Sequence, residues 1–226
     1  MKKIVFASFL IVSFGFSQAF SAGEPAIPAP ALKVGDSWTY EIKDGYNRLL
    51  KDRVRQDLIE IKDQSLEIRV VGQSGAEQDR QVYSSQWNWV SSPLLGNNRR
   101  NFDPPYAAFA FPLEVGKSWT EQSTVEDPVS GKKNIIKVYG KVMGWERIKV
   151  PAGEFDALKV TRRVYMDDRE WWRSGTKIYE VDWYAPAARQ VVKRTHQSGY
   201  FDLAQDDRPF MDGNRYWVEL TEYRLN

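Results

Sequence analysis

The sequence predicts an all-β protein, built as a curved antiparallel sheet, a half-barrel or a barrel with little helix. Apolar and polar residues alternate with a period of two in several runs, as they do in strands buried on one face. Turn-forming residues separate these runs, and no segment carries a sustained helical stripe with caps. We expect about ten to twelve strands.

The N-terminus has the organisation of a secretory signal peptide. Lys2 and Lys3 precede an apolar run from Ile4 to Phe16, and small residues follow. The run is shorter than the roughly 20 residues that span a bilayer, although an uncleaved anchor is the alternative. We predict a signal peptide over residues 1–21, with cleavage after Ser21 and no membrane span afterwards.

Composition narrows the function classes. The chain has 32 basic and 30 acidic residues, and removal of the two signal-peptide lysines leaves 30 of each. A neutral mature chain argues against nucleic-acid binding. The chain has no cysteine, which excludes disulfides, thiolate nucleophiles and a lipid-bearing cysteine. We therefore expect a periplasmic or extracellular bacterial envelope protein that is not a lipoprotein.

The elements follow in order along the chain. Residues 22–31 are rich in proline and predict an extended spacer. Alternating strands are predicted at 65–71, 135–142, 179–183 and 216–220.

Two short segments predict hairpin turns, and one segment is a helix candidate. KDQS (62–65) and PAGE (151–154) each separate two alternating runs, and Pro151 and Gly153 suit a tight turn. The helix candidate is NFDPPYAAFAF (101–111), where Pro104 and Pro105 leave room for one or two turns.

An eight-residue pattern occurs twice. LKVGDSWT (32–39) matches LEVGKSWT (113–120), with Gly35 and Gly116 before Trp38 and Trp119. In each copy the glycine permits a bend and the tryptophan begins a strand. A weaker pair is QVYSSQW (81–87) and KIYEVDW (177–183).

These repeats predict two related β-units, 32–112 and 113–226, within one compact domain. We expect Gly35, Trp38, Gly116, Trp119, Pro151 and Gly153 to be structural turn and core residues. Chance recurrence in a tryptophan-rich chain is the alternative.

Three motifs suggest a family. RIKVPAGEFDALKV (147–160) resembles the V-P-A-G-x-[FY]-x-A-x-K hairpin of a TapB-like group of exported bacterial proteins of unknown function. FPLEVGKSW (111–119) and WYAP (183–186) resemble two further motifs of that group, in the same order. The match covers roughly residues 111–195. The resemblance implies an extracytoplasmic β-rich fold and no reaction.

The residues offer little catalytic or metal chemistry. His196 is the one histidine, no Gly-x-Ser-x-Gly elbow is present, and we interpret His196 as a strand residue near a sheet end. The acidic loop 205–214 lacks the spacing of an EF-hand. We expect no catalytic residue, no metal site and no cofactor, and a protein that is not an enzyme.

The tryptophans are the best candidates for contact residues. Adjacent strand residues face opposite ways, so Trp171 and Trp172 cannot both enter one core if their segment is a strand. We predict ligand or partner contacts at Trp171, Trp172 and Trp89.

Three functions remain open. The first is a non-catalytic ligand-binding or carrier module for a small apolar ligand. The second is an envelope protein–protein interaction or assembly factor. The third is a carbohydrate-binding or carbohydrate-active protein, in which Trp171 or Trp172 lies beside two carboxylates in a groove.

Overall fold

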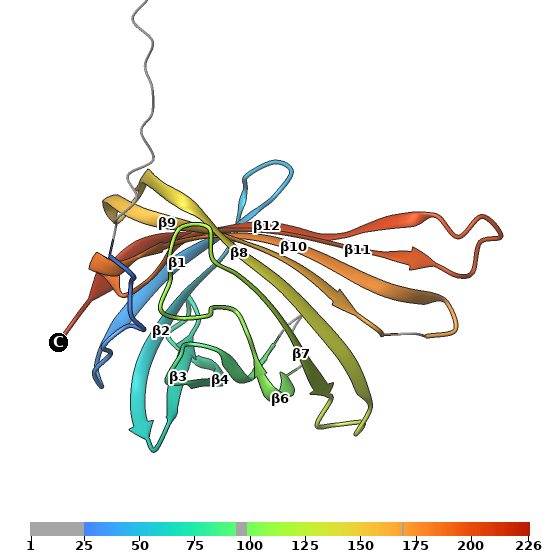
Figure 1. Ribbon diagram of the computed structural model, residues 1–226, viewed down its shortest axis with the longest axis horizontal. Coiled ribbons are helices and arrows are strands. Elements are labelled where there is room, and N and C mark those ends of the chain that lie inside the picture. Colours follow the sequence, from blue (N-terminus) through green and yellow to red (C-terminus); the bar gives the residue numbers. More distant parts are fainter. Residues whose placement is uncertain (1–24, 94–98, 169) are drawn as a thin grey trace, which may run out of the picture.

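The computed structural model describes residues 25–93, 99–168 and 170–226, so the predicted signal peptide (1–21) lies outside the described residues. These residues form twelve strands and one 3₁₀ turn (Figure 1). The elements are β1 (Ser37–Asp44), β2 (Leu50–Lys62), β3 (Ser65–Val71), β4 (Glu77–Ser84), β5 (Trp89–Pro93), β6 (Arg99–Tyr106), β7 (Ser118–Glu126), β8 (Lys133–Val150), β9 (Gly153–Met166), β10 (Arg173–Ala185), η1 (Pro186–Ala188), β11 (Gln190–Asp202) and β12 (Phe210–Arg224).

The strands form a closed antiparallel barrel. Each strand pairs with the next one in the sequence, and β1 pairs with β12 to complete the ring. The all-β prediction is confirmed. Of the predicted architectures, which were a curved sheet, a half-barrel and a barrel, the chain adopts the barrel. Strands β8–β12 are long, and Figure 1 shows their hairpins extending beyond the rest of the barrel.

Alternation along each strand places the core inside the barrel. On β8, Ile136, Val138 and Val142 are buried, whereas Lys137 and Tyr139 between them are exposed. Because successive side chains point to opposite sides of a strand, one face of every strand can contribute to a common interior. The predicted strand segments at 65–71, 135–142, 179–183 and 216–220 all lie within strands.

Both predicted hairpin turns are present in the structure. The β2–β3 turn passes through Asp63 with φ 53°, and the β8–β9 turn passes Pro151 to Gly153, whose φ is 134°. The helix candidate at 101–111 is wrong. Pro104 and Pro105 lie inside β6, where they have no cross-strand partner, so their missing N–H groups cost no ladder hydrogen bond.

The two glycine–tryptophan turns have the same local geometry. Gly35 has φ 93° and donates to the Leu58 carbonyl on β2, and Gly116 has φ 87° and donates to Val142 on β8. The indole N–H of Trp38 donates to the carbonyl of Ala188 at 2.8 Å, and that of Trp119 donates to the carbonyl of Ala107 at 3.0 Å. β1 and β7 thus begin with matching turns.

The weaker pair of motifs falls on β4 and β10, but the side chains point differently. Tyr83 is buried and Tyr179 is 47% exposed. Trp87 lies in a turn with φ 60°, whereas Trp183 lies within β10. The segments 81–87 and 177–183 are therefore similar in sequence but not in side-chain orientation. The interpretation as two related units stays a prediction.

The proline-rich segment contacts the barrel. Ile27 and Leu113 exchange two backbone hydrogen bonds, at 2.9 and 2.7 Å, in an isolated antiparallel bridge. The described end of the predicted spacer therefore lies against the segment that precedes β7.

Within the described part of the chain, no helical segment is long and apolar enough to cross a membrane.

Candidate functional site

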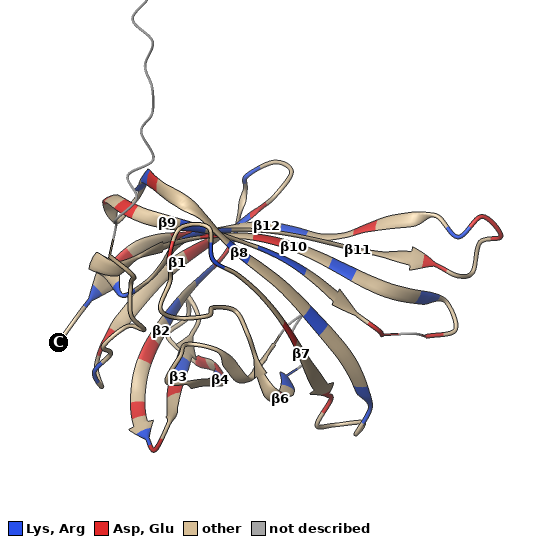
Figure 2. Ribbon diagram, in the orientation of Figure 1, with Lys and Arg blue, Asp and Glu red and all other residues tan. Residues whose placement is uncertain are grey.

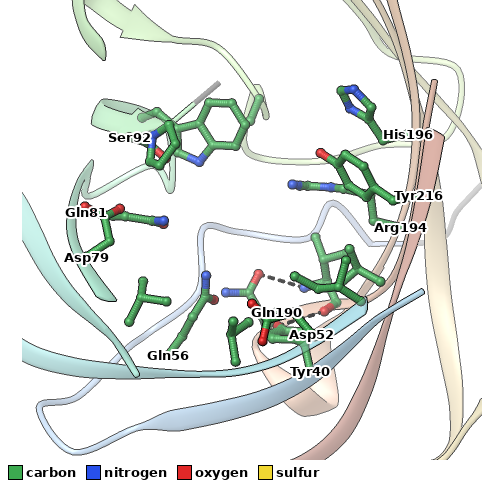
Figure 3. A pocket seen from close by; sticks show the side chains of 18 of the residues that line it. Tyr40, Asp52, Gln56, Asp79, Gln81, Ser92, Gln190, Arg194, His196 and Tyr216 are labelled. Carbon is green, nitrogen blue, oxygen red and sulfur yellow. Dashed lines mark hydrogen bonds between the residues drawn. The ribbon is translucent and has the colours of Figure 1, made fainter. Parts of the chain in front are cut away.

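A cavity of about 770 Å³ lies inside the barrel (Figure 3). Its walls come from β1–β5 on one side and β11–β12 on the other, and the connection after β6 contributes Ala108 and Phe109. The polar and aromatic lining includes Tyr40, Gln56, Gln78, Asp79, Gln81, Tyr83, Trp87, Trp89, Gln190, Arg194, His196, Asn214 and Tyr216.

Hydrogen bonds hold several lining side chains in place. Tyr40 donates to the carbonyl of Val191 at 3.0 Å, and the Trp87 indole N–H donates to Oε1 of Gln190 at 3.0 Å. Tyr83 donates to Oε1 of Gln81 at 2.7 Å, and its ring stacks on Trp87 at 4.4 Å. Burial raises the pKa of Tyr83 to about 12, which keeps its hydroxyl a donor at neutral pH. The two amides keep their NH₂ groups for other partners.

A row of polar residues crosses the interior beside this cavity. Arg162 on β9 pairs in register with Glu180 on β10, which pairs with His196 on β11, which pairs with Tyr216 on β12. Paired residues on adjacent strands point to the same face. The antiparallel register therefore brings four interacting side chains together from positions far apart in the sequence.

Arg162 lies at one end of this row and has no exposed surface. Its Nη2 donates to Glu180 at 2.7 Å and to Asp182 at 2.8 Å, while Nη1 donates to the carbonyl of Ala108 at 3.1 Å. A buried guanidinium is stable only when charge partners and hydrogen bonds replace water. The two carboxylates and the carbonyl meet that condition.

Arg194 extends from the interior network into the cavity. Asp182 accepts two hydrogen bonds from it, at 2.6 Å from Nε and 2.8 Å from Nη2. Figure 3 shows its side chain pointing into the cavity beside Tyr216. The bidentate contact fixes the guanidinium plane, and within the described residues Nη1 has no hydrogen-bond partner.

His196 is held by two contacts and has one unused nitrogen. Its Nδ1 lies 3.0 Å from Oε1 of Glu180, and its ring stacks on Tyr216 at 4.4 Å with an interplanar angle of 7°. A carboxylate only accepts, so Nδ1 is assigned as the donor, and in the tautomer with its proton on Nδ1 the Nε2 atom is an acceptor. Nε2 is buried and has no partner among the described residues.

Groups on the two neighbouring strands, β9 and β11, set the protonation of Glu180. Burial alone would raise its pKa, but the Arg162 guanidinium, with Arg194 and His196, holds the pKa well below its usual range. Glu180 is therefore an acceptor at neutral pH. Burial raises the pKa of Tyr106 and Tyr216, so both hydroxyls stay protonated.

The opposite wall contains a second unused acceptor. Asp79 on β4 accepts from Arg99 at 2.8 Å through Oδ1, while its Oδ2 is buried without a partner in the described chain. Figure 3 places Asp79 and Gln81 across the cavity from His196 and Arg194. Native proteins rarely leave buried polar atoms unpaired, so each such atom calls for a water or ligand partner.

The three predicted contact tryptophans lie in two places. Trp89 lines the cavity, where its ring stacks on Tyr106 at 4.7 Å. Trp171 and Trp172 lie in the β9–β10 connection and are not part of the cavity lining. Trp171 is 84% exposed, and Trp172 packs edge-to-face on Tyr200 at 5.4 Å.

Sequence reasoning missed the interior charge row. His196 is a strand residue, but it belongs to a buried polar network and not to an ordinary sheet end. Only Arg162 gave a sequence signal, as a charged residue between the apolar Val160 and Val164 on β9. Glu180 and Asp182 alternate with Tyr179, Val181 and Trp183 in the sequence and read as the polar outward face of a strand, whereas the structure places both acids inward. These side chains meet because of the strand register, which cannot be predicted from any short segment of the sequence.

Metal-binding geometry was sought across the described ranges. No group of three or more His, Cys, Asp or Glu side chains in those ranges could hold an ion.

The chain was compared with known proteins. No family model matches the chain. No curated protein matches it.

Solved structures do share its fold. A "putative lipoprotein" from Parabacteroides distasonis superimposes with a TM-score of 0.52 at 15% identity, over 89% of this chain and 100% of that one. A "putative exported protein with YmcC-like fold" from Bacteroides fragilis gives a TM-score of 0.50 at 14% identity, over 88% and 100%. The hypothetical lipoprotein YmcC from Escherichia coli gives 0.48 at 12% identity, over 83% and 84%.

The first two neighbours share the fold of this chain, and the second is named as having a YmcC-like fold. The comparison also corrects one prediction. The TapB-like resemblance is not among the matches. The prediction that the chain is not a lipoprotein is wrong on this comparison, because the first neighbour is named a lipoprotein. That prediction rested on the lack of cysteine in the printed sequence alone. The predicted export fits the second neighbour, which is named an exported protein.

Proposed function

We propose that the protein is a non-catalytic binding protein, which holds a neutral polyhydroxylated ligand of saccharide size in the barrel cavity. The observation that carries the proposal is the cavity itself, whose lining combines amide side chains with aromatic rings. Its volume of about 770 Å³ falls within the range of small-molecule sites.

The amide side chains favour a ligand with hydroxyl groups. The cavity is lined by Gln56, Gln78, Gln81, Gln190 and Asn214. A carboxamide both donates and accepts, and so does a hydroxyl, so the two groups can pair in either direction. A wholly apolar ligand would leave these amides without partners, at a cost for each one.

The unused acceptors favour a ligand that donates hydrogen bonds. His196 Nε2 and Asp79 Oδ2 lie in opposite walls, and each lacks a partner within the described residues. A ligand with hydroxyls at both ends can donate to both atoms. Arg194 Nη1 can in turn donate to a hydroxyl or ring oxygen.

Charge balance favours a neutral ligand. The lining contains the cations Lys51, Arg194 and Arg215 and the acids Asp52 and Asp79. Neither sign dominates, so neither a polyamine nor a dianion finds a complementary wall. The Trp89 ring supplies the apolar surface on which a flat ligand face can pack.

Titration with defined probes tests the proposal. We would follow tryptophan fluorescence and binding heat with glucose, N-acetylglucosamine, maltose and cellobiose, and with spermidine and decanoate as comparison ligands. His196→Asn keeps an amide donor near the Nδ1 position for Glu180 and removes Nε2. Asp79→Asn keeps an acceptor for Arg99 and replaces the unused acceptor with a donor.

We expect at least one neutral saccharide to bind, and each variant to weaken its binding about tenfold, as the loss of one buried hydrogen bond predicts. Asp156→Asn, an exposed change of the same kind on β9, is the matched control. Binding of decanoate or spermidine in place of every saccharide would contradict the ligand class. Absence of binding by every probe would contradict the assignment of the cavity as a binding site.

A further inference from the structure

The outer surface of β8–β10 differs in charge from the rest of the barrel. Outward positions on β8 are Lys137, Tyr139 and Lys141, which alternate with buried residues. On β9 and β10 the exposed outward positions next to them are Arg163, Tyr165, Lys177 and Tyr179. We call these seven residues the outer Lys–Tyr face.

The strand register arranges this face as alternating cations and tyrosines. Tyr165 pairs with Lys137 on one side and Lys177 on the other. In the next row, Arg163 pairs with Tyr139 on one side and Tyr179 on the other. Strands lie about 4.8 Å apart, so the nearest cations within a row are about 10 Å apart.

The cations on this face have no acidic partners. Within the described residues, none of Lys137, Lys141, Arg163 and Lys177 forms an ion pair, and Lys177 lies over the rings of Phe201 and Phe210. The paired outward positions on the flanking strands are uncharged: Ser118, Thr120, Gln122, Gln197 and Gly199. The face is therefore positive without local compensation.

Several cations on the outer surface of β2 and β4 are, by contrast, paired with acids. On β2 and β4, Arg53 contacts Glu41, Arg55 contacts Asp57 at 2.9 Å, and Arg80 contacts Glu67 at 3.0 Å. Figure 2 shows red and blue bands mixed on β2 and β3 and blue bands along β8. An uncompensated group of cations on a chain with net charge +2 is thus a local feature.

The tyrosines give the face a second property. Tyr139, Tyr165 and Tyr179 are 39%, 43% and 47% exposed. Ile135 and Met143, at the two ends of the same outward row of β8, are also exposed. Tyrosine rings have an apolar body and a polar tip, and they collect at membrane–water interfaces.

We propose that the outer Lys–Tyr face docks on the surface of a bilayer that contains anionic lipid. The cations attract the charged headgroups, and the tyrosines with Ile135 and Met143 enter the interface between them. A specific acidic protein would need carboxylates at fixed positions, whereas mobile headgroups can move to each cation. The face binds beside the bilayer and needs no strand or helix to enter it.

Vesicle sedimentation tests this docking. The probes are vesicles of phosphatidylglycerol and phosphatidylcholine in equal parts, and vesicles of phosphatidylcholine alone. The full chain should bind the anionic vesicles preferentially, and binding should fall steeply as salt approaches about 1 M, where charges are screened beyond about 3 Å.

Two matched triple variants distinguish vesicle binding through the outer Lys–Tyr face from binding that depends only on net charge. Lys137→Gln, Arg163→Gln and Lys177→Gln together should weaken vesicle binding roughly a hundredfold, since each cation near the surface contributes about a fivefold factor. Arg53→Gln, Arg55→Gln and Arg80→Gln remove the same charge from paired positions and should weaken it much less. If the first triple variant does not fold, each of its single changes should still weaken binding about fivefold.

Three results would overturn the proposal. One is equal binding of wild type to both kinds of vesicle. Another is an equal loss in the two triple variants, which would mean a dependence on net charge alone. The third is binding of soluble polyglutamate through this face without binding to anionic vesicles, which would point to an acidic polymer as the partner.

Discussion

Glu180 connects the buried Arg162 to His196. Its carboxylate accepts from Arg162 through Oε2 and from His196 through Oε1. Arg194 is fixed in turn by Asp182. The side chains that face the cavity are thus held in place by carboxylates on β10 that lie behind them.

Replacement of Glu180 tests this network. Glu180→Gln leaves the buried Arg162 with less compensation, and we expect the free energy of unfolding at pH 7 to fall by about 3–5 kcal/mol. Urea denaturation measures this loss. The exposed change Glu121→Gln on β7 is the control and should alter the value by about 0.5 kcal/mol or less.

The pH dependence gives a second test of the same residue. The folded-state pKa of Glu180 lies below its unfolded value of about 4.3, so its contribution is complete above that pH and is lost as pH falls through the folded pKa. Between about pH 5 and pH 2, the free energy of unfolding should fall more steeply in wild type than in Glu180→Gln. Parallel curves would contradict the lowered pKa. The charged and titratable groups around Glu180 are Arg162, Asp182, Arg194, His196, Tyr106 and Tyr216.

Trp171 and Trp172 were predicted as contacts, and that stays a prediction. The Trp171→Ala, Trp172→Ala double variant should remain folded, because Trp171 is 84% exposed. If these rings contact a ligand or partner, the variant should bind more weakly than wild type in the saccharide titration or in vesicle sedimentation. Unchanged binding in both experiments would contradict the hypothesis.

At the scale of elements, the glycine–tryptophan turns show what a repeated sequence can mean. In both copies the glycine takes a positive φ, its N–H bonds to the second following strand, and the tryptophan indole bonds to a distant carbonyl. The same residues thus begin β1 and β7, which each start a run of six strands.

Truncation of these tryptophans tests their structural role. Trp38→Ala and Trp119→Ala should each lower the free energy of unfolding by about 3–5 kcal/mol, because both rings are buried and both indole N–H groups are bonded. Trp171→Ala is the exposed control. Unchanged unfolding midpoints for Trp38→Ala and Trp119→Ala would remove the main support for two related units.

The elements were more predictable than their interactions. Alternation in 65–71 and 135–142 predicted β3 and part of β8, because burial of one face is a local property of the sequence. The sequence did not predict β6, because Pro104 and Pro105 argue against a strand. In the structure both prolines lie at positions of β6 that have no cross-strand partner. Arg162, Glu180 and His196 lie on three strands, and their contact follows from register and not from spacing.

At the scale of the whole molecule, closure of the barrel creates both proposed surfaces. Pairing of β1 with β12 joins the cavity-lining strands β1–β5 to β11 and β12, which encloses the cavity. Strands β9 and β10 contribute charges to the interior, and together with β8 they present cations and tyrosines outside. The barrel thus has a polar interior site and a positive outer face.

Barrel closure could not be derived from the sequence. The prediction stopped at a curved sheet, half-barrel or barrel, because pairing of the first and last strands is the most distant contact in the chain. The mixed polar and aromatic lining of the cavity depends on that closure. A small apolar ligand was therefore expected where the lining favours a polar one.

Native mass spectrometry of protein purified gently from its own cell envelope would show whether the barrel cavity holds a ligand. We expect a reproducible added mass that corresponds to a neutral saccharide and that is reduced in His196→Asn and Asp79→Asn. A clean mass of the protein alone, together with no binding of any saccharide probe, would contradict the claim that the cavity is a binding site.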